Sequence, residues 1–140
     1  MIINNRIKIA MTNINFQAKP QVGFGEAVKS FFGNYANFRG RARRSEFWWV
    51  MVFLCILYAV ASGIDYAIYG KPGTVYGIVC LATFIPNLAI SWRRLHDIGK
   101  SGANWFWGIV PVIGLILLIV WYVRDSEPDV NRFGTSPKYQ

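Results

Sequence analysis

The sequence predicts an all-α integral membrane protein, with three transmembrane helices preceded by a short amphipathic juxtamembrane helix. Hydrophobic residues make up 54% of the 140 residues and charged residues only 16%, whereas a soluble domain carries roughly a quarter charged residues. The charges gather between long apolar runs, and lysine and arginine outnumber acids in the polar segments ahead of the first and third runs. These features are typical of a one-domain, multi-pass membrane protein.

Three apolar runs are long enough to cross a hydrocarbon core of ~30 Å, which needs about 20 helical residues. They cover residues 47–69, 74–92 and 103–123, and their one charge is Asp65. We expect helices because a backbone in lipid must satisfy its own hydrogen bonds. Helices of a soluble bundle would show polar stripes at helical spacing, which these runs lack. Asp65 stands near the end of its run and is expected to face water.

The third run has two interpretations, because Pro111 and Gly114 stand near its middle. Proline removes a helix hydrogen bond and kinks the helix, so a kinked single span is the first interpretation. A re-entrant hairpin, with arms too short to span alone, is the alternative. The single span sends the C-terminus outside, whereas the hairpin returns it to the cytoplasm.

The chain ahead of the first run divides into two parts. Residues 1–23 are polar and predict a loosely ordered lead. From residue 24, apolar residues recur at spacings of three and four. This pattern predicts a short helix, either at the membrane surface or packed on the spans. The expected membrane domain covers residues 24–137, and its end overlaps a polar C-terminal tail, residues 124–140.

The distribution of basic residues predicts the orientation. Residues 1–46 carry eight Lys/Arg and two acids, residues 93–102 carry three Lys/Arg and one acid, and the turn 70–73 carries one Lys. Lysine and arginine stay on the cytoplasmic side. The N-terminus and residues 93–102 should therefore be cytoplasmic, and the turn 70–73 should face outward.

Four arginines stand directly before the first run, in "RGRARR". Near a cytoplasmic membrane face each basic residue attracts anionic lipid by about 1 kcal/mol. A topology anchor alone is the alternative, and nucleic acid is not an expected partner because the segment is tethered to the bilayer and carries no recognisable binding fold. Ser45 is expected to cap the first span. The predicted anionic phospholipid-binding residues are Arg39, Arg41, Arg43 and Arg44.

The segment "RRLHDIGKSG", residues 93–102, holds the single histidine of the chain, His96. It lacks the first glycine and the preceding strand of a phosphate-binding loop. His96 and Asp97 are neighbours whose side chains diverge, so a nucleophile would have to come from elsewhere. With one histidine and no paired cysteine spacing, no metal site is expected. We expect no cofactor and no catalytic residue.

The same segment is instead interpreted as a helical hairpin loop that closes against the first motif. Gly99 and Gly102 can supply positive φ, Asp97 is expected to bond backbone N–H groups of the turn, and Ser101 is expected to cap the third span. Ion pairs across the two motifs would form a structural clasp. The expected pairs are Glu46 with Arg93 or Arg94, and Asp97 with Arg41 or Arg44.

The two segments together resemble the bacterial family called domain of unknown function 805 (DUF805), the YhaH-like inner-membrane proteins. The resemblance covers about residues 35–137, and its second motif is long and specific. It implies a multi-pass protein of the bacterial inner (plasma) membrane without an assigned activity. The matching residues are Gly40, Arg41, Arg44, Glu46, Phe47 and Trp48, and Arg93, Arg94, Leu95, His96, Asp97, Gly99, Ser101 and Gly102.

Three function classes remain open at this point. The first is a small structural or interaction protein whose basic cytoplasmic face binds anionic lipid or a partner, including a second copy of the chain or another membrane protein. The second is a transporter or channel component, for which Asp65 is the candidate intramembrane acid. The third is a membrane enzyme acting on a lipid or phosphate ester with His96 as base. We expect no enzymatic activity and favour the first class.

Overall fold

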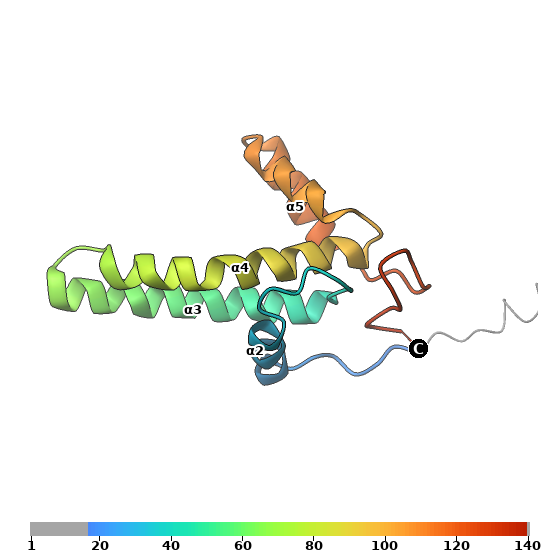
Figure 1. Cartoon of the computed structure of the whole chain (residues 1–140), viewed down its shortest axis with the longest axis horizontal. Helices are drawn as coiled ribbons and strands as arrows, with labels where there is room; N and C mark the ends of the chain where they lie inside the picture. Colours follow the sequence, from blue (N-terminus) through green and yellow to red (C-terminus); the bar gives the residue numbers. More distant parts are fainter. Residues whose placement is uncertain (1–16, 140) are drawn as a thin grey trace, which may run out of the picture.

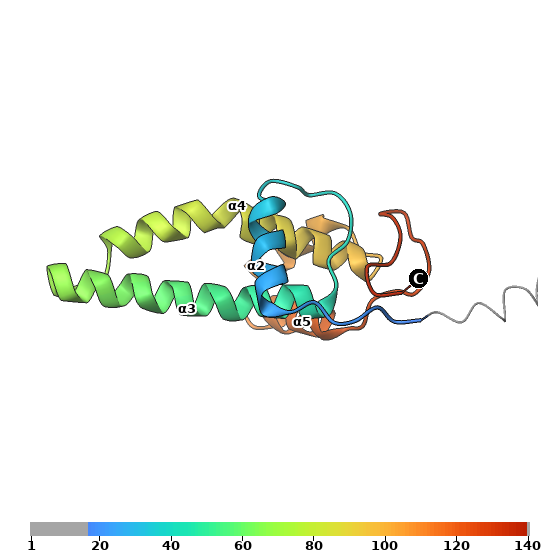
Figure 2. The same cartoon turned by 90° about the horizontal axis from the view of Figure 1, so that it is seen from below.

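The computed structural model describes residues 17–139, and its elements are helical. Helix α3 and helix α4 form a long antiparallel pair, α2 lies across this pair, and α5 stands away from it (Figures 1 and 2). Residues 1–16 of the predicted lead lie outside the described part of the chain. The elements are α2 Phe24–Gly33, α3 Arg44–Tyr69, α4 Thr74–Asp97, the 3-10 helix η1 Gly102–Ile109 and α5 Ile113–Val123.

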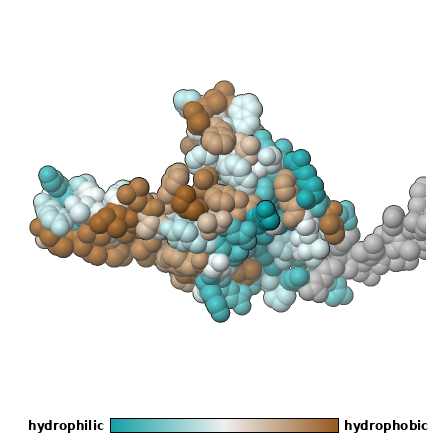
Figure 3. All heavy atoms as spheres, in the orientation of Figure 1, coloured by the Kyte–Doolittle hydropathy of each residue, from teal (hydrophilic) through white to brown (hydrophobic). Residues whose placement is uncertain are grey.

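Helices α3 and α4 are long and apolar enough to cross a membrane. They have 26 and 24 residues, and their most apolar windows have mean hydropathies of 2.1 and 1.6. Only 22% and 28% of those windows are buried, whereas a core helix of a soluble protein is mostly covered. Hydrophobic residues coat most of the exposed α3–α4 pair, and hydrophilic residues gather where α2, the two motifs and the tail meet (Figure 3). The surface therefore fits lipid around these two helices.

Helix α2 forms where the sequence pattern predicts a short helix, and it packs against the first long helix. Its buried residues are Ala27 and Phe31. The Phe31 ring lies 6.1 Å from the ring of Phe53 on α3, in an edge-on arrangement. The amphipathic face thus contributes to the hydrophobic core, together with Val50 and Leu54.

A proline inside α4 explains one link between α2 and this helix. Pro86 lacks a backbone N–H and therefore leaves the carbonyl four residues earlier, at Ala82, without its usual helical donor. The hydroxyl of Tyr35, just after α2, donates a hydrogen bond to the Ala82 carbonyl. Thr83 also donates to the carbonyl of Val79 at 2.7 Å. Side chains thus satisfy the backbone around the proline.

The sequence interpretation expected Asp65 to face water, and this expectation is wrong. Its side chain is fully buried and accepts backbone hydrogen bonds from Gly73 at 3.0 Å, Val75 at 2.8 Å and Tyr76 at 2.9 Å. These N–H groups lie at the start of α4 and have no partner within the helix. Asp65 therefore caps α4 from the last turn of α3.

The third apolar run does not form the single helix expected over residues 103–123, and its fold favours the hairpin among the two interpretations. The run divides into η1 and α5, and Ile113 N–H bonds the Pro111 carbonyl at 2.7 Å around Val112, which has φ 63° and ψ −64°. This is a tight γ-turn with the rare positive φ. A Cβ on Gly114 would lie 1.7 Å from the Trp107 carbonyl oxygen, so glycine permits α5 to fold back onto η1.

Both ends of this hairpin lie at the same end of α4. A Cβ on Gly102 would lie 2.0 Å from the Trp92 ring, while the carbonyl of Tyr122, near the end of α5, accepts a hydrogen bond of 3.2 Å from Arg94 Nε. The tail then runs back to the N-terminal lead, where Lys19 N–H bonds the Lys138 carbonyl at 2.7 Å. The C-terminal tail therefore lies beside the two motifs.

Candidate functional site

The carboxylate of Asp97 is the centre of the polar cluster that joins the two motifs. It stands in the last turn of α4 and is fully buried. Its Oδ1 accepts from Arg41 Nε at 3.1 Å, and its Oδ2 accepts from Arg94 Nη1 at 2.6 Å and from the Ser126 hydroxyl at 2.5 Å. The sequence interpretation expected this side chain to bond backbone N–H groups of the turn, and that expectation is wrong. Two arginines and a hydroxyl therefore compensate the buried charge.

Arg41 connects Asp97 to the C-terminal tail. Besides the bond to the Asp97 carboxylate, its guanidinium donates to the Asp97 carbonyl at 3.1 Å and to the Glu127 carbonyl at 2.6 Å. It also reaches the carbonyls of Asp129 at 2.9 Å and Gly134 at 3.2 Å. A guanidinium has five N–H donors, and five hydrogen bonds engage them. Arg41 therefore has no donor left for a ligand.

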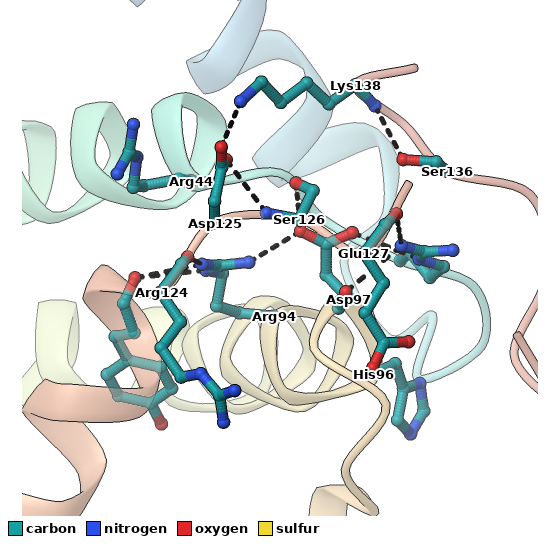
Figure 4. Close-up of polar contacts among 12 residues, drawn as sticks. Arg44, Arg94, His96, Asp97, Arg124, Asp125, Ser126, Glu127, Ser136 and Lys138 are labelled. Carbon is teal, nitrogen blue, oxygen red and sulfur yellow. Dashed lines mark hydrogen bonds and ion pairs between the residues drawn. The ribbon is translucent and has the colours of Figure 1, made fainter. Parts of the chain in front are cut away.

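Arg94 connects the same carboxylate to the end of α5. Its Nε and Nη2 donate to the Tyr122 carbonyl at 3.2 and 3.1 Å, and Nη2 also donates to the Arg124 carbonyl. The last carbonyls of a helix have no partner within it, so Arg94 caps α5. In Figure 4, Arg94 extends from α4 between these carbonyls and Asp97.

Glu46 and Arg93 form a second link between the motifs. Arg93 Nη1 lies 3.5 Å from Glu46 Oε1, and the same oxygen accepts from the Ser30 hydroxyl of α2 at 2.7 Å. The backbone adds a bond of 3.0 Å from Ala42 N–H to the Arg93 carbonyl. Thus the structure places Glu46 with Arg93 and Asp97 with Arg41, and adds Arg94 to the latter pair.

His96 points away from Asp97 and takes part in docking the tail. Its Nδ1 lies 2.9 Å from the Gly40 carbonyl oxygen, and its ring stacks on Phe133 with centroids 3.8 Å apart and planes 5° apart. Its carbonyl accepts from Asn131 Nδ2 at 2.9 Å. In Figure 4 the imidazole lies on the far side of the helix end from Arg94. These contacts give His96 a packing role.

Gly99 and Ser101 of the second motif shape the turn after α4, whereas Gly102 begins η1 and does not have the positive φ expected of it. Gly99 has φ 75° and its N–H bonds the His96 carbonyl at 3.0 Å. Positive φ at the end of a helix favours glycine. The Ser101 hydroxyl accepts from Ala103 N–H at 3.3 Å, so it caps η1, the first part of the third apolar run. Leu95 is fully buried in the helix end.

The remaining residues of the first motif lie around the start of α3. Phe47 is buried and its ring lies 4.5 Å from the Tyr122 ring of α5, whereas Trp48 is exposed. Arg44 is exposed and donates to the Val123 carbonyl at 3.3 Å, so it pairs with neither Glu46 nor Asp97. Ser45 does not cap α3: the cap position is Arg43, and the Ser45 hydroxyl has no hydrogen-bond partner.

The four arginines predicted to bind anionic lipid differ in their exposure. Arg41 and Arg43 are 9% and 5% exposed, and Arg43 donates to the Pro20 carbonyl at 2.6 Å. Their burial contradicts the accessibility that binding lipid requires. Arg39 and Arg44 are exposed, so these two of the four predicted lipid-binding residues remain available.

An ion pair at the start of the tail lies beside Arg44 (Figure 4). Lys138 Nζ contacts Asp125 Oδ2. Burial by itself raises the pKa of the Asp125 carboxyl, but hydrogen bonds from Lys138 and from the Ser126 N–H outweigh it and hold this pKa below its usual range. Desolvation lowers the pKa of Lys138, yet the bonds to Asp125 and Tyr139 leave it raised.

Sequence reasoning missed several members of this site. Ser126 and the Glu127 carbonyl belong to the tail and the Tyr122 carbonyl to the end of α5, and the return of both to the motifs depended on the hairpin. The Arg94–Asp97 pair was detectable, because residues three apart on a helix lie on one face. Nothing in the sequence pattern indicated that Ser30 would reach Glu46.

Comparisons with known proteins identify the family. The family model described as "Protein of unknown function (DUF805)" matches residues 35–135. The chain belongs to the DUF805 family. The match covers both motifs, the α3–α4 pair, the hairpin and the tail up to the Gly134 that Arg41 contacts. The resemblance inferred from the two motifs is therefore confirmed.

Relatives of this DUF805 protein are named as inner-membrane proteins. Escherichia coli K12 "Inner membrane protein YhaI" is 36% identical over 110 residues, which cover 79% of this chain and 93% of the relative. "Inner membrane protein YhaH" of the same organism is 35% identical over 114 residues, 76% of this chain and 92% of the relative. "Uncharacterized protein YiiR" is 29% identical over 83 residues, 59% of this chain and 53% of that protein. No solved structure matches the chain.

Proposed function

We propose that this DUF805 protein is a small structural and interaction protein of the bacterial inner membrane, whose motif-bearing end faces the cytoplasm and binds anionic lipid. The observation that carries the proposal is that the charged groups of both motifs engage one another. Arg41 uses its five donors on Asp97 and the tail, and Asp97 holds Arg41, Arg94 and Ser126. Groups engaged in this way hold segments together and are poorly placed for turnover.

The orientation within the proposal rests on the basic residues. Lysine and arginine are retained on the cytoplasmic side, and Arg39, Arg44 and Arg124 are exposed near the motif end. The N-terminal lead, the loop after α4 and the C-terminal tail would then all be cytoplasmic. The turn at residues 70–73 would face outward, with α3 and α4 as the two complete spans.

The two other function classes have less support among the described residues. Asp65, the candidate acid for transport, accepts three backbone N–H bonds at the start of α4 and is thereby occupied as a cap. His96, the candidate base, stacks on Phe133 and contacts the Gly40 carbonyl. Neither contact brings a nucleophile to the imidazole. We therefore keep the structural and interaction role as the proposal.

A lipid-retention experiment tests this function. The full-length protein would be reconstituted in bilayers with equal parts of phosphatidylglycerol and phosphatidylcholine of identical acyl chains, then released into the gas phase for native mass spectrometry. We expect retained lipid to be enriched in phosphatidylglycerol. Equal retention of both lipids would contradict the proposed lipid-binding face. Thermal unfolding of Asp97→Asn in the same bilayers tests the structural part separately.

A further inference from the structure

Two adjoining hollows at the start of α3 share a wall and differ in character. The larger, of about 290 Å³, is lined by Gln21, Ser45, Trp48, Trp49 and Val52. The smaller, of about 50 Å³, lies against basic residues at the start of α3 and against the tail. Gln21 and Ser45 line both, so the two hollows adjoin. The smaller hollow is lined by Gln21, Arg43, Arg44, Ser45, Asp125 and Lys138.

We infer that these hollows together form a site for one anionic phospholipid, with its phosphate in the smaller hollow and the start of an acyl chain in the larger. This inference deepens the proposed lipid-binding function and depends on it. A phospholipid needs an apolar surface for its acyl chain beside a basic surface for its phosphate. The start of α3 has both surfaces next to each other.

The charge of the smaller hollow favours an anion. Three basic side chains and one carboxylate line it, so positive charge remains after Lys138 pairs with Asp125. Arg43 is buried and donates to the carbonyls of Lys19 at 3.4 Å and Pro20 at 2.6 Å, so it contributes charge rather than an accessible donor. Arg44 is exposed and gives one hydrogen bond, to the Val123 carbonyl at 3.3 Å. Neither arginine is paired with a carboxylate, and a guanidinium has five donors, so Arg44 has donors left for an anion.

An unsatisfied hydroxyl provides a second and independent indication. The Ser45 Oγ is buried and has no hydrogen-bond partner, although buried polar atoms are nearly always bonded. Ser45 stands in the first turn of α3, where no side chain caps the helix start. The partial positive charge of a helix N-terminus stabilises an anion there. A phosphate oxygen at this position would accept from the serine hydroxyl.

The larger hollow fixes the class of ligand. Trp48 and Trp49 are exposed beside it, and tryptophan is enriched at the level of lipid headgroups. Val52 continues this wall toward the apolar part of α3. A free phosphate would leave this apolar wall uncovered, whereas a phospholipid covers it with an acyl chain. We therefore assign the site to a lipid.

The test compares two single variants of the full-length protein with the parent protein in detergent. Native mass spectrometry follows titration with phosphatidylglycerol and, separately, phosphatidylcholine. Arg44→Gln should weaken phosphatidylglycerol binding about fivefold, since one basic residue near the surface contributes roughly that factor. Arg39→Gln removes the same charge from an exposed residue outside both hollows and should weaken binding clearly less than Arg44→Gln does.

The outcomes separate the site from the broader function. If phosphatidylglycerol is preferred but Arg44→Gln and Arg39→Gln weaken it equally, the attraction is diffuse and the site is refuted while the proposed function stands. If the parent protein shows no preference, the lipid function itself fails. Excess inorganic phosphate should leave binding unchanged; full competition would identify free phosphate as the ligand.

Discussion

Arg41 and Asp97 face each other with Nε 3.1 Å from Oδ1, and their side chains are 1% and 0% exposed. Fifty-six residues separate them in sequence, so this pair joins the segment before α3 to the end of α4. Because Arg41 also bonds the Glu127 carbonyl at 2.6 Å, the pair holds the tail as well. The two motifs therefore act through one buried charge cluster.

Removal of either partner should strongly destabilise the protein. Breaking a buried ion pair from one side costs about 3–5 kcal/mol, because the other charge stays buried. We expect Asp97→Asn and Arg41→Gln each to lower the free energy of unfolding in detergent by several kcal/mol. The double variant should lose less than the sum, since it leaves only the charge of Arg94 without its carboxylate rather than the charges of both arginines, with a coupling of about 0.5–3 kcal/mol. Thermal or denaturant unfolding measures this cycle.

Arg44 provides the matched control for this cycle. It is an arginine of the same motif but it is exposed and bonds the Val123 carbonyl. The effects of Arg44→Gln and Asp97→Asn should therefore add. Additivity in the Arg41 cycle as well would show that the buried cluster does not stabilise the fold in the way its geometry indicates.

The turn between η1 and α5 depends on one glycine. A Cβ at Gly114 would lie 1.7 Å from the Trp107 carbonyl oxygen, whereas nothing lies within 4 Å of a Cβ at Gly63. Overpacking a core costs about 1–3 kcal/mol. We expect Gly114→Ala to destabilise the protein by at least this amount, because the added Cβ would meet a backbone atom. Gly63→Ala in α3 should stabilise it slightly, by up to about 1 kcal/mol. Equal melting temperatures for the two variants would rule out the close packing of the hairpin.

The cap on α4 gives a local prediction. Asp65→Ala removes the acceptor for the N–H groups of Gly73, Val75 and Tyr76. Hydrogen exchange of these amides should accelerate, while exchange at the motif end of α4, around Leu95, stays unchanged. Mass-spectrometric exchange in nanodiscs measures both regions. If protection were lost equally at both ends, Asp65 would have a role beyond this cap.

Acid should release the tail through Asp125. Its pKa is lowered in the folded protein, so its stabilising contribution is present above the unfolded value, ~4, and is lost as the pH falls through the folded value. The protection of the Lys19 amide, which bonds the Lys138 carbonyl, should therefore fall below about pH 4, when its exchange is compared with that of an unfolded chain at the same pH. Asp125→Asn should remove this acid step, whereas Asp129→Asn, at an exposed residue of the same tail, should retain it. A step of the same size in all three proteins would assign it to another group.

The parts of the fold that follow from local pattern could be predicted. The apolar runs that became α3 and α4 have the length and composition that lipid requires. Opposite charges at one end of the spans predict that Glu46 pairs with Arg93 or Arg94 and Asp97 with Arg41 or Arg44, but not which arginine each acid takes. The η1–α5 hairpin was only an alternative, because a proline inside an apolar run is compatible with a kink and with a reversal. The close approach at Gly114 decided it, and such an approach is a tertiary feature.

The role of each arginine depended on this unpredicted tertiary structure. From the sequence, Arg41 and Arg43 are equivalent to Arg39 and Arg44 as members of a basic segment. Burial separates them, since the tail covers Arg41 and the N-terminal lead covers Arg43. Similarly, the sequence shows Asp65 only as a polar residue near the end of a span. Its role as a cap depends on the tertiary contact with the start of α4. Charge count predicts a membrane face, but it does not predict which charges remain accessible.

The position of the C-terminus distinguishes the two interpretations of the third apolar run in living cells. Single cysteines would be introduced at Lys71, Ser101 and Thr135 in a protein with Cys55 and Cys80 replaced by alanine. An impermeant thiol reagent added to intact cells should label Lys71→Cys only, because the α3–α4 turn faces outward in the proposed orientation and the tail lies with the motifs. All three should label after the membrane is permeabilised. Labelling of Thr135→Cys in intact cells would mean that the third run crosses the bilayer, and then the contacts of Arg41 with the tail could not form. Labelling of both Ser101→Cys and Thr135→Cys, without Lys71→Cys, would reverse the orientation and leave the hairpin intact.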